Sequence, residues 1–73
     1  MPVVKVIELV SSSESSFDDA VQSGLAEATR TLRGVSGIEI TNWTVDVENN
    51  NITRYKVTMK VAFRVREGEG GGL

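Results

Sequence analysis

The residues from Ile52 to Arg66 alternate between apolar and polar side chains, and this pattern predicts a long strand with one buried face. The apolar set consists of Tyr55, Val57, Met59, Val61, Phe63 and Val65. The alternating polar set includes five of the eight basic residues, Arg54, Lys56, Lys60, Arg64 and Arg66. Another element must cover the apolar side of such a strand. The basic side must face solvent, another subunit or a ligand.

The covering element is predicted to be a helix that begins near Phe17. Apolar or small residues recur at helical spacing, at Phe17, Ala20, Val21, Gly24, Leu25, Ala28 and Leu32. Ser16 is the expected N-cap with Asp19 as its capping-box partner, Arg30 and Arg33 suit the negative end, and Gly34 can close the helix. The small residues on the stripe suggest that the helix lies close against a sheet.

Two further strands and two turns complete the predicted elements. The β-branched run Val3–Val10 predicts a first strand, and the serines of residues 11–16 predict a turn. Ile38–Val47 predicts another strand, and the polar break at Glu48–Asn51 predicts a hairpin turn, because Asn tolerates positive φ.

Handedness and pairing rules then predict an α+β fold of β-α-β-β order, a three-stranded antiparallel sheet wrapped around one helix with the strand at residues 52–66 in the middle. We expect one domain over residues 1–66. Residues 67–73 hold four Gly, two Glu and one Leu, and we expect a flexible tail there.

The chain is short and has neither Cys nor His, so no disulfide or structural zinc can reinforce a small core. Association of identical copies is the remaining source of stability, and the uncovered face of the sheet is the expected contact. The N-terminus lacks the features of a secretory signal, which predicts a cytoplasmic location. No apolar run is long enough to span a bilayer, so we expect no membrane association.

Trp43 is the second residue that we expect on the uncovered face. By simple alternation it has the opposite parity to Ile38 and Ile40, so it points away from the helix if these isoleucines point toward it. An outward Trp suits a subunit contact or a planar ligand, and the pattern leaves both open.

At this point the chain resembles the dodecin family. The resemblance rests on Val4-X-Val6-Ile7-Glu8-Leu9-Val10, on Ser16-Phe17, on Thr31-Leu32-Arg33 and on the run from Tyr55 to Arg64. It implies a hollow homododecamer whose sheets pack through their uncovered faces. It also implies paired flavin rings at two-fold axes, bound for storage or sequestration without catalysis.

The resemblance also locates candidate ligand contacts. Without gaps, the family's stacking Trp falls on Gly37 and its hydrogen-bonding Gln falls on Lys56, which donates hydrogen bonds but cannot accept them. Trp43 lies six residues beyond Gly37, roughly 20 Å along a strand, and the basic strand, including Arg64, suits a flavin phosphate. We therefore expect FMN or riboflavin as the ligand, with Gly37, Lys56, Trp43 and Arg64 as its contacts.

A non-flavin structural or calcium-binding assembly is the alternative, because Gly37 offers no ring for stacking. Oxygen ligands for calcium are available at Glu39, Asp46, Glu48 and the Asn49–Asn51 turn, but EF-hand spacing is absent and no metal ligand is assigned. We expect no enzymatic activity, since no catalytic constellation is evident. Nucleic acid is not an expected partner, because Tyr55 and Phe63 belong to the helix-facing set.

Overall fold

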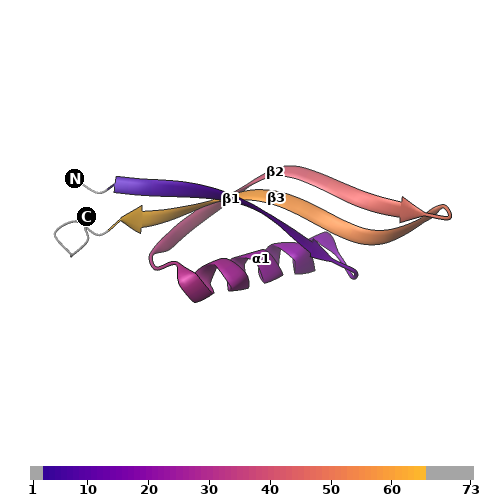
Figure 1. Cartoon of the computed structure of the whole chain (residues 1–73), viewed down its shortest axis with the longest axis horizontal. Coiled ribbons are helices and arrows are strands. Elements are labelled where there is room, and N and C mark those ends of the chain that lie inside the picture. The colour runs from indigo at the N-terminus through magenta and orange to yellow at the C-terminus, as the bar shows by residue number, and fades with distance from the viewer. Residues whose placement is uncertain (1–2, 66–73) are drawn as a thin grey trace.

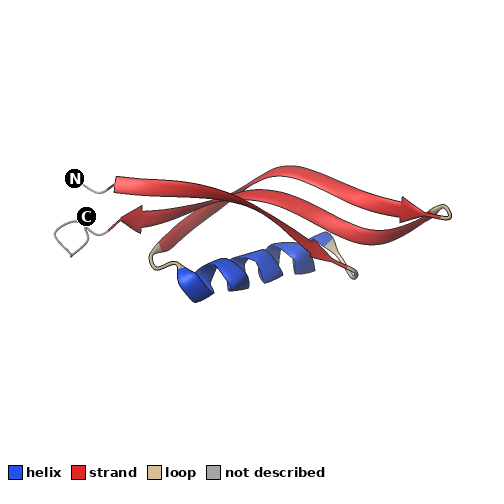
Figure 2. Cartoon of the chain, in the orientation of Figure 1, coloured by secondary structure: helices blue, strands red, loops and turns tan. Residues whose placement is uncertain are grey.

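The computed structural model describes residues 3–65 and contains three strands and one helix in the order β1-α1-β2-β3. The elements are β1 (Val3–Ser13), α1 (Phe17–Thr31), β2 (Val35–Glu48) and β3 (Asn51–Val65). The sheet order is β1-β3-β2 and both pairings are antiparallel. The helix covers one face of this sheet (Figure 2). The predicted fold class is confirmed, while Arg66 and the predicted tail at 67–73 lie outside the described residues.

The core is formed where the helix meets β3. Val57, Met59 and Val61 are fully buried, and the helix contributes the buried residues Ala20, Gly24 and Ala28. A Cβ at Gly24 would lie 2.7 Å from Met59 Cε and 3.1 Å from Ser11 Cβ. The close approach that the small residues predicted is therefore confirmed.

β1 is longer than the apolar run predicted. Ser11, Ser12 and Ser13 continue the strand and pair with Val57, Lys56 and Tyr55, so only Glu14, Ser15 and Ser16 connect it to α1. The prediction of a turn beginning at Ser11 is wrong. Serine is compatible with the strand here because Ser11 faces Gly24, where a larger side chain would collide with the helix.

Ser13 joins the end of β1 to the start of the helix. Its hydroxyl donates to Asp19 Oδ2 at 2.7 Å and accepts from the backbone N–H of Ser15 at 2.9 Å. Ser16 is the N-cap, as predicted, and its hydroxyl accepts from Asp19 N at 2.9 Å. The Asp19 carboxylate contacts Ser13 and not the Ser16 amide, so the reciprocal half of the predicted capping box is replaced by this bond.

Replacing Ser13 by Ala is expected to lower the free energy of unfolding by about 1–2 kcal/mol, because a largely buried hydroxyl with several partners is lost. Thermal unfolding at a fixed chain concentration measures the change. The control is Ser12→Ala, which removes an exposed hydroxyl from the same strand. Equal melting temperatures for the two variants would contradict this role for Ser13.

The helix ends slightly earlier than its apolar stripe. Leu32 is the C-cap in an extended conformation, and its N–H donates to Ala28 O at 2.9 Å. Gly34 has the predicted positive φ of 72°, but it forms the turn into β2, and its carbonyl accepts from Arg64 N at 2.9 Å. Arg30 lies in the last helical turn as predicted, whereas Arg33 lies beyond the helix.

Three register irregularities interrupt the pairing of β2 with β3. In each, one residue stands without a direct partner: Ser36 and Thr41 on β2, and Thr53 on β3. All three carry a hydroxyl that donates to a carbonyl of the opposite strand, Ser36 to Ala62 O, Thr41 to Thr58 O and Thr53 to Asp46 O. These side-chain hydrogen bonds join β2 to β3 where the bulges interrupt the regular backbone pairing.

The bulge at Thr41 overturns the predicted direction of Trp43. Trp43 pairs with the buried, helix-facing Val57, and its ring lies 5.1 Å from the Phe17 ring in an edge-to-face arrangement. Trp43 is therefore on the helix side of the sheet. Simple alternation fails because one extra residue reverses the facing of every residue after it.

The chain is elongated for its size. Its principal extents are 54 × 19 × 14 Å and its radius of gyration is 15.1 Å, against about 11 Å for a compact domain of this length. The β2–β3 hairpin extends past the start of α1, as Figure 1 shows. No helix in the described part of the chain has the length and apolar character needed to cross a membrane.

Candidate functional site

The sheet face that points away from α1, here called the outer face, carries both apolar and charged residues. On β1 it presents Val4, Val6 and Val10, whose exposed fractions are 51%, 55% and 63%. Val4 and Val6 lie opposite Arg64 and Ala62, respectively. Exposed valines on a strand are typical of a surface that becomes covered by another molecule.

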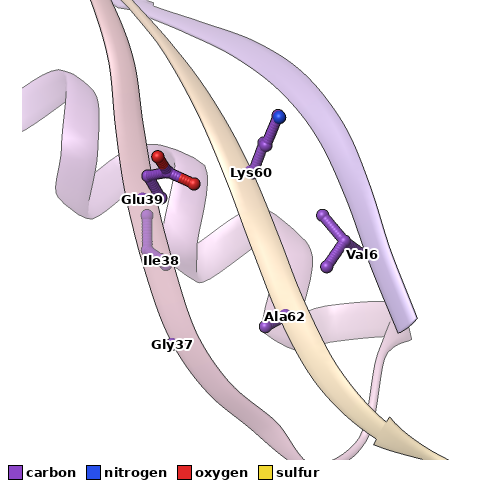
Figure 3. A pocket seen from close by; sticks show the side chains of 6 residues that line it. All are labelled: Val6, Gly37, Ile38, Glu39, Lys60 and Ala62. Atoms are coloured by element: carbon purple, nitrogen blue, oxygen red, sulfur yellow. The ribbon is translucent and has the colours of Figure 1, made fainter. Parts of the chain in front are cut away.

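A hollow of about 510 Å³ lies on this face near the start of β2. It is lined by Val6, Gly37, Ile38, Glu39, Lys60 and Ala62. Figure 3 shows Val6, Ala62 and the bare backbone of Gly37 along the hollow, with Glu39 and Lys60 standing together at one end. The site thus combines an apolar floor with one charged end, which is the usual composition of a small-molecule pocket.

Gly37 determines how open this hollow is. A Cβ built at Gly37 would have no heavy atom within 4 Å, so the position has room for a side chain. Gly37 pairs with Ala62, and Val6 pairs with Ala62 from the other side. Three small or medium residues in one row across the sheet leave a surface on which a planar group can lie.

The four residues predicted as ligand contacts do not gather in one place within a chain. Gly37 and Arg64 share the same end of the outer face, since Arg64 lies two residues along β3 from Ala62. Lys56 is on the same face but six residues from Ala62, roughly 20 Å away along the strand. Trp43 is on the opposite face, so the prediction that it lies on the outer face is wrong.

Lys56 has a local partner on β2. Its ammonium lies 3.2 Å from Asp46 Oδ1, and both side chains are about two-fifths exposed. Arg54 lies 4.0 Å from Glu14. The basic residues of β3 are thus partly balanced by carboxylates.

Trp43 instead belongs to an aromatic cluster that sequence reasoning missed. The Phe17 ring lies 5.1 Å from both the Trp43 and the Tyr55 rings, at steep interplanar angles of 85° and 76°. Such edge-to-face pairs fix the start of the helix against the hairpin. Trp43 is the third residue after Ile40, a step that breaks the alternation of two and could have signalled the bulge.

Gly37 apart, the residues that line the pocket were not predicted as ligand contacts. Val6 and Ala62 were treated as ordinary strand residues, because only the register between β1, β2 and β3 shows that they flank Gly37. As for metals, residues 3–65 contain no cluster of three acidic side chains suited to hold an ion. The carboxylates named for calcium are distributed along β2, and Asp46 is paired with Lys56.

Comparisons with known proteins agree with this architecture. The dodecin family model matches residues 3–66. The dodecin of Thermus thermophilus is 34% identical over 65 residues, which cover 89% of this chain and 94% of that protein. The structure of the dodecin from Streptomyces coelicolor matches with a TM-score of 0.87 at 28% identity, covering 92% of this chain and 96% of that one.

A further match is a calcium dodecin from Mycobacterium tuberculosis, with a TM-score of 0.78 at 19% identity over 92% of this chain and 96% of that one. This last likeness is one of fold alone. The family match and the Thermus relative both span nearly the whole described chain. The chain belongs to the dodecin family.

Proposed function

We propose that this protein binds a small planar molecule without turning it over, with riboflavin or FMN as the first candidates. The observation that carries the proposal is the outer-face hollow, in which Val6, Gly37 and Ala62 form an apolar floor. The flavin-binding members that the sequence resembles place their ligand at this position of β2. Storage or sequestration is the corresponding role, and the absence of Cys and His from the sequence is consistent with binding without catalysis.

The proposal includes assembly into a homododecamer through the outer faces. The helix covers only part of one side of the sheet, and on the other side Val4, Val6 and Val10 stay half exposed or more. The hollow is open toward the same side, so a second copy that covers these valines also closes it. Binding and assembly are then two consequences of one surface.

Within this site we assign Gly37 to the floor beneath the ligand and Arg64 to the nearby phosphate of FMN. Lys56 lies too far from Gly37 to contact the same ligand within one chain. A Lys56 from a neighbouring copy could contact the ligand only if its ion pair with Asp46 were broken. Trp43 is not included, because it contacts Phe17 on the helix side. The cytoplasmic location stays a prediction from the sequence.

Titration of riboflavin with the purified protein tests the binding proposal. We expect flavin fluorescence to fall as the chain concentration rises through the micromolar range, because burial against protein groups changes the emission of the ring. A parallel titration of FMN shows whether the phosphate group changes the affinity. Unchanged emission of both flavins at tens of micromolar protein would remove flavin as the ligand.

Replacing Val6 by Lys is expected to dissociate the assembly, because each interface would then bury an unpaired ammonium, at a cost of several kcal/mol. Sedimentation velocity at equal chain concentration compares the variant with the parent. Gln22→Lys is the control, since it adds the same charge to an exposed position of α1. A variant at Val6 that sediments like the parent would show that the outer face is not an interface.

Calcium is the weaker candidate. It rests on the fold likeness to a calcium dodecin and on carboxylates that residues 3–65 do not bring together. A calcium role predicts a melting temperature that rises with added calcium and falls with chelator. A melting temperature that changes with neither calcium nor chelator would exclude calcium and leave flavin as the proposed ligand.

A further inference from the structure

We infer that Glu39 and Lys60 together recognise the hydrogen-bonding edge of the bound ring, and that the ligand is a planar heterocycle with a donor N–H next to an acceptor carbonyl, as in a cyclic imide. This inference rests on the proposed function and names the polar contacts of the same pocket. It concerns residues that the family resemblance did not mark.

The first support is position. Glu39 on β2 and Lys60 on β3 are direct cross-strand partners, which places their Cβ atoms about 4.5–5.5 Å apart. Both side chains line the hollow. Figure 3 shows the two side chains on neighbouring strands at the same end of the site.

The second support is that these are the charged groups of the lining. The other lining residues, Val6, Gly37, Ile38 and Ala62, have no polar side-chain atom. Among residues 3–65 the ion pairs join Arg30 to Glu27, Arg54 to Glu14 and Lys56 to Asp46, and they include neither Glu39 nor Lys60. An acceptor and a donor are thus both available at one end of an apolar floor.

The third support is the hydrogen-bonding complementarity between Glu39 and Lys60 and the edge of the ligand ring. A carboxylate only accepts hydrogen bonds and an ammonium only donates them, so the pair matches a ring edge that presents one N–H and one carbonyl. In riboflavin these groups are the N3–H and the adjacent C4 carbonyl. A ring on the Gly37 floor with this edge toward Glu39 and Lys60 buries its apolar part and satisfies its polar part.

The charge at this end also selects against an anion. Lys60 is flanked across the strands by Glu8 as well as by Glu39, so two carboxylates surround one ammonium. A phosphate would be repelled by this net negative charge. The neutral edge of the ring therefore occupies this end, and any charged substituent points away from it.

The test compares riboflavin with N3-methylriboflavin, in which the donor N–H is replaced by a methyl group. The parent protein is expected to bind riboflavin roughly ten-fold more tightly, because one charge-assisted hydrogen bond is lost with the methyl analogue. In Glu39→Met the two flavins are expected to bind equally, since the acceptor is gone. In Lys60→Met both are expected to bind roughly ten-fold more weakly, while the preference for riboflavin persists.

A purely structural role for the pair would not produce this pattern. Lys5→Met is the matched control, because it makes the same chemical change on the opposite side of the sheet, across from Phe63. Thermal unfolding and sedimentation verify that each variant is assembled. Equal affinity of the parent for both flavins, or an unchanged preference in Glu39→Met, overturns the inference and leaves the proposed function standing. Failure of the parent to bind riboflavin overturns the proposed function, and the inference with it.

Discussion

The Gly37→Trp variant is expected to bind riboflavin about two- to ten-fold more tightly for each indole that contacts the ring, because aromatic stacking contributes about 0.5–1.5 kcal/mol beyond burial. The structure permits the change. A Cβ at this position has no neighbour within 4 Å, and the side chain would extend over the floor formed by Val6 and Ala62. Where two copies each place one indole on one ring of a ligand pair, each ring gains up to about ten-fold, and the product of the two binding constants rises by up to roughly a hundred-fold.

Fluorescence titration of parent and variant at equal concentration measures this gain. Gly37→Leu is the matched control, because it fills the same space with apolar atoms but has no ring to stack. We expect a larger gain in riboflavin affinity for the Trp variant than for the Leu variant. A Trp variant that binds riboflavin no better than the parent would mean that the ligand does not lie at Gly37.

The Met59→Ala variant is expected to lose about 2–5 kcal/mol of stability, because a fully buried side chain is truncated and leaves a cavity. For a small domain this is a large part of the total free energy of unfolding, typically about 5–15 kcal/mol. Denaturant unfolding at a fixed chain concentration measures the loss. Val47→Ala, at a position that is 58% exposed, is expected to change stability little.

Gly24 provides a second check on the same contact. In the parent, Gly24→Ala places a methyl group 2.7 Å from Met59 Cε, so either the side chain of Met59 or the helix must shift. In the Met59→Ala background that collision is absent. The substitution at Gly24 is therefore expected to cost less there, and strictly additive effects would show that the helix and Met59 do not compete for this space.

The fold was predictable because its main signals are local and agree with one another. The alternation in β3 identified Val57, Met59 and Val61 as the buried face, and the small residues Ala20, Gly24 and Ala28 indicated the close helix. The paired asparagines at the hairpin both adopt positive φ, 53° at Asn49 and 66° at Asn50, as their residue type suggested. Each of these conclusions depends on residues near one another in the chain.

The bulges were not predicted, and they account for the error at Trp43. The helix-side apolar residues of β2 are spaced by three where a bulge intervenes, from Val35 to Ile38 and from Ile40 to Trp43. On β3 the same step separates Ile52 from Tyr55, across Thr53. A bulge is therefore signalled where the spacing between helix-side apolar residues changes from two positions to three. A Ser or Thr between the two apolar residues strengthens this signal.

The candidate site was predicted only in part because it depends on register. Gly37 and Arg64 were named from the resemblance, but the row of Val6, Ala62 and Gly37 arises from the alignment of three strands that are distant in sequence. The same register places Lys60 between Glu8 and Glu39. A single strand read alone appears basic, whereas the assembled sheet presents mixed charge.

In our proposal, other copies of the chain cover the outer face. Sedimentation velocity of the parent protein, diluted stepwise from micromolar to nanomolar concentration, tests it most directly. We expect a particle many times heavier than one chain, and we expect the chain to unfold whenever that particle dissociates. A folded single chain that persists at the highest dilution would contradict the claim.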